Sequence, residues 1–225
     1  MFRDALLDAL ALVLPVECAG CGAPDRSLCA GCRAALAGEP QSHRLADGTP
    51  ATSALDYEGP VRRAILALKE SGRTDVAPAL SVPLALAMTE AVTGARGVAG
   101  PPVETLLVPT GRAAFRRRGY DPLALLVRRA GVPHARVLTQ IRASTQQKHL
   151  ALDERSRNRA GTMRATRPLD GRRFLLVDDV LTTGSTLAEA ARAVRAEGGE
   201  IVAAATLAYT RKRVQHPGIH SLNVS

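Results

Sequence analysis

The chain has 225 residues, of which 46% are hydrophobic, enough to fill the core of one α/β domain with a small appendage. No run of sequence approaches the ~20 apolar residues that a membrane helix requires, which excludes membrane insertion. The net charge of +9 is concentrated in residues 111–173, where 16 Lys and Arg face 4 Asp and Glu. A basic region of this size suits an anionic ligand or a nucleic acid, although a solvated basic face would have the same composition.

The first 16 residues superficially resemble a signal peptide. Asp4 and Asp8 interrupt the apolar stretch, and its uninterrupted part, residues 9–14, is shorter than an apolar signal region of ~7–15 residues. The spacing of the apolar side chains is helical: they are Leu6, Leu7, Leu10 and Val13. We therefore expect a short amphipathic helix that packs on its own domain, and a cytoplasmic protein.

Four cysteines follow, and they are the only ones in the chain: Cys18, Cys21, Cys29 and Cys32. Two C-x-x-C pairs can complete a tetrahedral Zn²⁺ site, and four protein ligands leave no open position for catalysis. We predict a structural zinc, which would fold a segment too small for a core of its own. An iron–sulfur cluster is an alternative on ligand type, and disulfides are a further one that a reducing compartment disfavours.

The next segment reads as a linker, a strand and two helices. Residues 38–50 are polar and rich in turn residues, which predicts the linker, and residues 51–57 form the strand. Pro60 opens the first helix, with Val61, Ile65 and Leu68 on one face and Lys69 at its end. Lys69 at that position would complement the helix dipole. The second helix covers residues 77–93, where Pro83 is expected to interrupt it.

A short buried strand at residues 105–109 leads into Thr110, Gly111 and the arginine-rich segment 116–118. Guanidinium groups there could neutralise a pyrophosphate, or follow a nucleic-acid backbone with Tyr120 as a stacking ring. We favour Arg118 for pyrophosphate and the other arginines for solvent or nucleic acid. Residues 142–159 are rich in Arg and Gln, and a lid of such residues would suit an anionic ligand, although Asp153-Glu154-Arg155 could also start a helix.

The most informative segment is an apolar strand from Arg173 that runs into two acids and a Thr/Gly/Ser turn. Its residues are Asp178, Asp179, Val180, Leu181, Thr182, Thr183, Gly184, Ser185 and Thr186. Carboxylates at the carboxyl edge of a parallel sheet can accept hydrogen bonds from a ribose diol. The following helix, residues 186–197, presents backbone N–H groups to an anion. The sequence has neither a P-loop nor a dinucleotide-binding motif, so a ribose 5-phosphate is the better ligand.

A last strand at residues 200–209 completes a right-handed βαβ unit, so the sheet is expected to be mostly parallel, with flanking helices. We divide the chain into an N-terminal helix and zinc module at residues 1–40, a main domain at residues 51–213 and a tail at residues 214–225.

The acid pair and its turn resemble the phosphoribosyl-pyrophosphate (PRPP) motif of type I phosphoribosyltransferases. Over residues 16–210 the chain is similar to the ComF (competence protein F) family. The matching segments are the four cysteines, residues 57–62, Leu68-Lys69, residues 118–121, Gln146, Glu154-Arg155 and Asn158. The resemblance implies a type I fold in which Asp178 and Asp179 meet the ribose hydroxyls and the Thr182–Thr186 turn wraps the 5-phosphate. It also implies that Thr110, Gly111 and Lys69 lie close to PRPP, which would bind with Mg²⁺.

Three functions fit these motifs. The chain could be an active phosphoribosyltransferase, in which a nitrogen nucleophile displaces pyrophosphate from PRPP in nucleotide metabolism. The resemblance implies instead a link to DNA uptake in natural transformation, with single-stranded DNA and DNA-uptake proteins as partners. A PRPP sensor without catalysis is the third hypothesis. Fold and donor motif alone do not separate the three.

Overall fold

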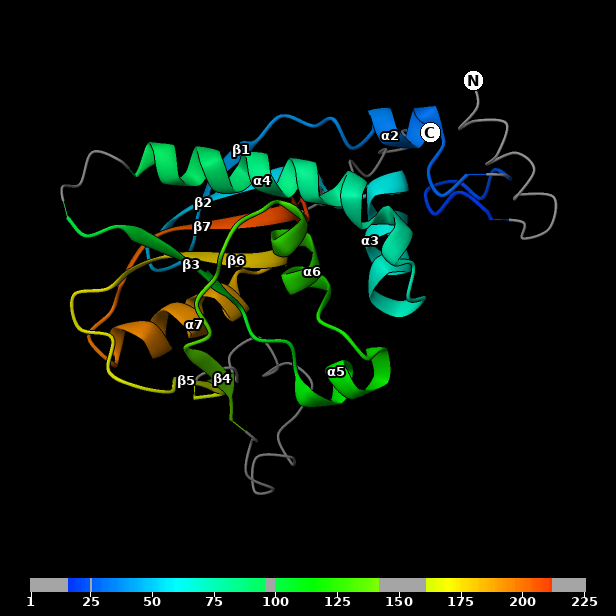
Figure 1. The fold of residues 1–225 in the computed structure, drawn as a ribbon. Coiled ribbons are helices and arrows are strands. Elements are labelled where there is room, and N and C mark those ends of the chain that lie inside the picture. Colours follow the sequence, from blue (N-terminus) through cyan, green and yellow to red (C-terminus); the bar gives the residue numbers. More distant parts are fainter. Residues whose placement is uncertain (1–15, 25, 96–99, 142–160, 212–225) are drawn as a thin grey trace, which may run out of the picture.

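The computed structural model describes residues 16–24, 26–95, 100–141 and 161–211. Its centre is a five-stranded sheet in the order β1-β2-β7-β6-β3 (Figure 1). The strands are β1 (Gln41–Arg44), β2 (Pro50–Asp56), β3 (Val103–Leu107), β6 (Arg173–Leu181) and β7 (Glu200–Tyr209). β1 pairs with β2 antiparallel, whereas the three other pairings are parallel. The predicted mostly parallel α/β fold is confirmed.

Helices cover both faces of this sheet, and a small hairpin lies beside it. The helices are α2 (Ala30–Ala34), α3 (Gly59–Glu70), the 3₁₀ turn η1 (Thr74–Val76), α4 (Ala77–Gly94), α5 (Arg112–Arg118), α6 (Pro122–Arg129) and α7 (Ser185–Arg195). The hairpin pairs β4 (Leu138–Gln140) with β5 (Met163–Ala165).

The alternation of side chains along β6 divides the core into two layers. Leu175 and Val177 pack with α3, α4 and α6 on one face. Phe174 and Leu176 pack with α7 on the other face. Because β6 is covered on both sides, its apolar run is nearly continuous up to the acids, as expected for a central parallel strand.

Helix α4 is longer and more apolar than expected from the sequence. Pro83 lies inside it without interrupting it. The segment Thr74–Gly94 is long and apolar enough to cross a membrane, with a mean hydropathy of 1.4, so the expectation that no run reaches that length is wrong. Half of that window is buried in the protein, and Leu80, Leu84 and Ala87 belong to the main core. α4 is therefore a core helix that covers the sheet.

The predicted linker at residues 38–50 is wrong, because β1 occupies part of it. Asp47 and Gly48 turn the chain so that β1 returns along β2, and Thr49 N–H donates to Asp47 Oδ1 at 3.0 Å. The other boundaries differ from the predicted ones by at most two residues, except that β6 continues beyond the acid pair to Leu181. The expected N-terminal helix, the lid and the tail lie outside the described residues, and the division into domains stays a prediction.

One buried carboxylate fastens the β4–β5 hairpin to α7. Glu189 Oε1 accepts a hydrogen bond from Met163 N–H at 2.9 Å, and Arg192 Nε donates to Glu189 Oε2 at 2.7 Å. Burial favours the neutral form, but Arg192 and the Met163 N–H group outweigh it and lower the pKa of Glu189.

We expect Glu189→Ala to lower the free energy of unfolding by about 2 kcal/mol, because Met163 N–H and Arg192 lose their acceptor. Glu189→Gln keeps an acceptor and should cost less.

The lowered pKa of Glu189 in the folded state makes the stability of the protein depend on pH. Its contribution is fully present above the unfolded-state pKa of Glu, about 4.3, and disappears as the pH falls through the folded-state value. Urea denaturation should therefore show a larger difference in unfolding free energy between the parent and Glu189→Gln at pH 7 than in acid. An equal difference under both conditions would contradict this account.

Candidate functional site

The sheet opens at the carboxyl ends of β3 and β6. β3 ends at Leu107, opposite Val177, and Val108 N–H donates to Val177 O at 2.9 Å. β6 continues to Leu181 and pairs there only with β7. After β3 the chain passes to α6 on one face of the sheet, and after β6 it passes to α7 on the other. In open α/β sheets ligands bind at such a divergence, and we call this edge of the sheet, at the carboxyl ends of β3 and β6, the crevice.

Asp178 and Asp179 occupy β6 at this crevice. Because successive side chains of a strand alternate, Asp178 shares the face of α7 and Asp179 shares the face of α3. Lys69 Nζ lies 2.7 Å from Asp179 Oδ2, and both side chains are about three-quarters buried. Asp179 N–H donates to Asp178 Oδ1 at 2.9 Å. The structure therefore brings Lys69, from a distant part of the sequence, to the acid pair.

The turn between β6 and α7 has the features of an anion loop. Gly184 is the N-cap residue of α7, with φ +76°, a left-handed conformation that glycine adopts without strain. Since glycine has no side chain, the first turn of α7 has no side-chain cap at this position. Thr183 Oγ1 donates to Ser185 Oγ at 3.0 Å, and both Thr182 and Thr183 are exposed. Hydroxyls and a helix N-terminus thus lie directly after the carboxylates.

The loop after β3 forms the opposite side of the crevice. Thr110 and Gly111 are half-buried, and Gly111 is the N-cap residue of α5. Gln140 Nε2 donates to Pro109 O at 2.9 Å. A Cβ atom on Gly111 would lie 3.0 Å from Gln140 Oε1, so the absence of a side chain permits this close approach. Gln140 was not identified from the sequence, because a strand of three residues has no detectable period.

Three consecutive residues at the end of α3, Leu68, Lys69 and Glu70, contact other residues of this site. Tyr120 Oη donates to Leu68 O, and Lys69 binds Asp179. Glu70 accepts hydrogen bonds from Arg118 Nη2 at 2.6 Å and from Arg117 Nη2 at 3.1 Å.

Arg118 is thus held against the end of α3 by Glu70, a carboxylate that was not identified from the sequence. Hydrogen bonding from Arg118 lowers the pKa of Glu70. Arg118 itself is only 13% exposed, and its Nε atom is buried without a hydrogen-bond partner among the described residues. Tyr120, by contrast, is half-buried with its hydroxyl engaged, so the alternative considered from the sequence, an exposed stacking ring, does not fit the structure.

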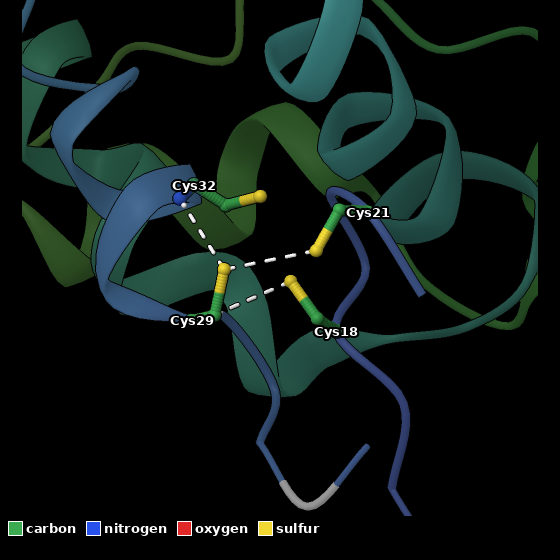
Figure 2. Close-up of side chains that lie close together, drawn as sticks. All are labelled: Cys18, Cys21, Cys29 and Cys32. Atoms are coloured by element: carbon green, nitrogen blue, oxygen red, sulfur yellow. Dashed lines mark hydrogen bonds between the residues drawn. The ribbon is translucent and has the colours of Figure 1, made fainter. Parts of the chain in front are cut away.

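The four cysteines form one cluster (Figure 2), with all four sulfur atoms within 4.8 Å of one another. Cys21 Sγ and Cys29 Sγ are 3.7 Å apart. Sulfurs in a tetrahedral site with Zn–S bonds of ~2.3 Å are separated by about 3.8 Å, so the arrangement fits a metal ion. All four residues are free cysteines, so the structure has none of the disulfides considered from the sequence.

Backbone amides donate to two of the sulfurs, Cys18 Sγ and Cys29 Sγ, as they would to thiolates, whereas burial raises the pKa of Cys32. Burial would raise the pKa of Cys18, but the N–H groups of Cys29 and Gly20, at 3.3 and 3.4 Å, outweigh it and lower the pKa to about 6. Gly20 is required by space, since a Cβ atom there would lie 2.5 Å from Cys32 Sγ. The same glycine accepts a hydrogen bond from Arg63 of α3 through its carbonyl oxygen. The cluster is therefore docked on the helix that carries Lys69.

A pocket of about 840 Å³ lies elsewhere, between the segment after α2 and the β2–α3 corner. Three acids line it, Glu39, Asp56 and Glu58, and none of the predicted PRPP-binding residues does. Asp56 also forms an ion pair with Arg211 at 2.7 Å. This pocket is distinct from the crevice between β3 and β6.

Comparison with known proteins finds the following similarities. A family model described as "Phosphoribosyl transferase domain" matches residues 114–225. The chain is 32% identical over 196 residues to the DNA utilization protein YhgH of Escherichia coli K12, covering 82% of this chain and 80% of YhgH. It is 35% identical over 111 residues to an orotate phosphoribosyltransferase of Pyrobaculum calidifontis, covering 48% of this chain and 55% of the relative. A solved orotate phosphoribosyltransferase from Aeropyrum pernix matches with 19% identity and a TM-score of 0.33, covering 79% and 77% of the two chains.

Proposed function

Because the chain belongs to the ComF family of phosphoribosyltransferase-domain proteins, the family of the YhgH relatives, we propose that it binds PRPP with Mg²⁺ in the crevice between β3 and β6. The observation that carries this proposal is the convergence of Asp178, Asp179, Lys69 and the turn before α7 at one edge of the sheet. A carboxylate pair, an ammonium group and an anion loop match the ribose, the pyrophosphate and the 5-phosphate of a single ligand.

In this proposal each part of the crevice takes one part of the ligand. The Thr182–Thr186 turn and the α7 N-terminus hold the 5-phosphate, and the acids accept hydrogen bonds from the ribose 2- and 3-hydroxyls. Thr110, Gly111, Lys69 and Arg118 face the pyrophosphate. Mg²⁺ would accompany the pyrophosphate and offset its charge. If a nucleophile attacks the anomeric carbon, the carboxylates are placed to stabilise the positive charge that develops on the sugar.

We further propose zinc as the metal of the cysteine cluster. Four thiolates in a closed set suit Zn²⁺ and leave no position for substrate. Its role is to hold the segment from Cys18 to Cys32 against α3, which contributes Lys69 to the crevice.

The cellular context proposed is DNA utilization in the cytoplasm. The YhgH relatives carry that description, and they match across four-fifths of this chain. PRPP would be either the donor of a phosphoribosyl group or a regulatory ligand that the protein binds without catalysis. The exposed arginines of α5, which follows the Thr110-Gly111 loop, are compatible with a nucleic acid close to the PRPP site.

Calorimetric titration of the zinc-loaded chain tests the proposal. With Mg²⁺ present, PRPP should bind more tightly than ribose 5-phosphate and pyrophosphate, because it alone fills all three parts of the crevice. Equal affinities for PRPP and pyrophosphate would mean that the ribose and 5-phosphate are not recognised, and would contradict the proposal.

Lys69→Ala should weaken the binding of Mg²⁺·PRPP by about tenfold, the effect of losing one charge-assisted hydrogen bond. The affinity for ribose 5-phosphate should change little, because that ligand lacks the pyrophosphate that Lys69 is proposed to contact. Lys69→Arg, which keeps the charge, is the matched control. Equal losses for both ligands would instead assign Lys69 a purely structural role at Asp179.

A further inference from the structure

We propose that the acidic pocket at the β2–α3 corner binds a basic segment of a partner protein. In this site the segment adds to the open edge of β1 as an extended strand, and its Arg or Lys side chains enter the pocket of about 840 Å³. The pocket lies at the β2 end of the sheet, where β7 separates β2 from β6, so the site is distinct from the PRPP crevice. It does not depend on PRPP binding.

The carboxylates of this pocket contrast with the chain as a whole, which carries a net charge of +9. Asp56 already holds a guanidinium group, since Arg211 donates to it from Nε at 2.9 Å and from Nη2 at 2.7 Å. Glu39 and Glu58 are exposed, and within the described part of the chain neither forms an ion pair. Two carboxylates thus remain for cationic groups from outside, of the kind that Asp56 already binds.

The rest of the lining is largely apolar. Its apolar residues are Ala35, Pro40, Ala54, Leu55, Pro60 and Val61. Arg and Lys pack their methylene groups on such a surface while the charged end of the side chain reaches a polar group. A site with a volume of ~300–1,000 Å³ accommodates a ligand larger than one side chain. A peptide segment therefore fits this pocket better than a small amine does.

The open edge of β1 offers hydrogen-bonding groups to a peptide backbone beside the pocket. β1 is the last strand of the sheet, and among the described strands it pairs with β2 alone. An edge strand presents N–H and C=O groups to which an extended peptide can add. Gln41, the first residue of β1, lines the pocket, and so does Glu39 two positions before it. A strand that pairs with β1 and continues past Gln41 therefore reaches the pocket, with every second side chain on one side.

The test selects binders from a display library of random peptides on the full-length, zinc-loaded chain. The selected peptides should carry Arg or Lys at alternate positions, and their affinity, measured by fluorescence anisotropy of labelled copies, should fall as salt is added. N-methylation of alternate backbone amides keeps the charge of a peptide but blocks strand pairing, so it should weaken binding at least about fivefold. A selection without basic binders, or full affinity after methylation, would overturn the proposal.

Glu39→Gln/Glu58→Gln should weaken the binding of the selected peptides at least about threefold, the effect of losing two exposed ion pairs. Both side chains are exposed, so the melting temperature should not change. Glu90→Gln/Glu197→Gln removes two acids that are exposed elsewhere on the surface, and this matched control should bind the peptides as the parent does. Equal affinities of the pocket variant and the parent would overturn the proposal.

A last variant distinguishes a partner protein from basic residues of this chain as the occupant of the pocket. Lys212 and Arg213 directly follow Arg211 in the sequence. Lys212→Gln/Arg213→Gln should leave peptide affinity unchanged, because the proposed ligand comes from another protein. A higher affinity in this variant would identify Lys212 and Arg213 as competitors for the pocket and would overturn the assignment to a partner.

Discussion

Replacing Asp178 and Asp179 together by Asn is expected to weaken the binding of Mg²⁺·PRPP by at least about 100-fold. Each carboxylate is proposed to accept a charge-assisted hydrogen bond from a ribose hydroxyl, and the loss of two such bonds amounts to about 3 kcal/mol or more. Asn preserves the size of each side chain, so the effect isolates the charge. Calorimetric titration of the purified double variant measures it directly.

A matched control is Glu104→Gln. Glu104 is a carboxylate on β3 at the amino end of the sheet, where it forms an ion pair with Arg172 at 2.7 Å, far along the strands from the crevice. This variant should bind Mg²⁺·PRPP as the parent does. An acid-pair variant whose affinity stays within about threefold of the parent would mean that the carboxylates do not meet the ribose.

Removing a cysteine ligand is expected to have the largest effect on stability. Cys32→Ser should lower the free energy of unfolding by at least about 3 kcal/mol, because metal binding and folding are coupled in small closed sites. For a chain of this size, such a loss lowers the melting temperature by roughly 6–12 °C. The effect should extend beyond the cluster, since Cys18, Leu28 and Cys32 pack in the same core as Ile65 of α3.

Thermal melts and metal analysis check this prediction. The parent chain, purified without added metal, should contain about one zinc, and a strong chelator should reproduce the effect of Cys32→Ser. Ala30→Ser, an exposed change between two of the ligands, should melt as the parent does. Iron with labile sulfide in the purified protein would instead identify the iron–sulfur alternative.

The elements best predicted from the sequence were those whose local signals agree with their packing. β6, α7 and β7 combine an apolar run, a glycine turn and an amphipathic helix, and β7 was predicted to the residue. β1 was missed because Gln41–Arg44 is polar and only half-buried, although Asp47-Gly48 between two extended segments is a hairpin signal. Pro83 did not break α4, because packing against the sheet outweighs one lost backbone hydrogen bond.

The candidate site, too, has one part that the sequence predicts and one part that it does not. The cysteines and the acid pair with its turn are local in sequence, so their spacing alone brings them together. The Lys69–Asp179 pair spans two distant elements, and its proximity was suggested only by the family resemblance. Glu70 and Gln140 left no signal, because each acts through a tertiary contact with residues 30 or more positions away.

The most direct test of the proposed function is a crystal structure of the zinc-loaded chain with Mg²⁺ and PRPP. We predict the 5-phosphate within hydrogen-bonding distance of the backbone amides of Thr183 to Thr186, the ribose hydroxyls on Asp178 and Asp179, and the pyrophosphate between Lys69 and the Thr110-Gly111 loop. A crevice that stays empty at saturating PRPP, or PRPP bound only through the arginines of α5, would contradict the proposal that this family member uses its sheet edge as a PRPP site.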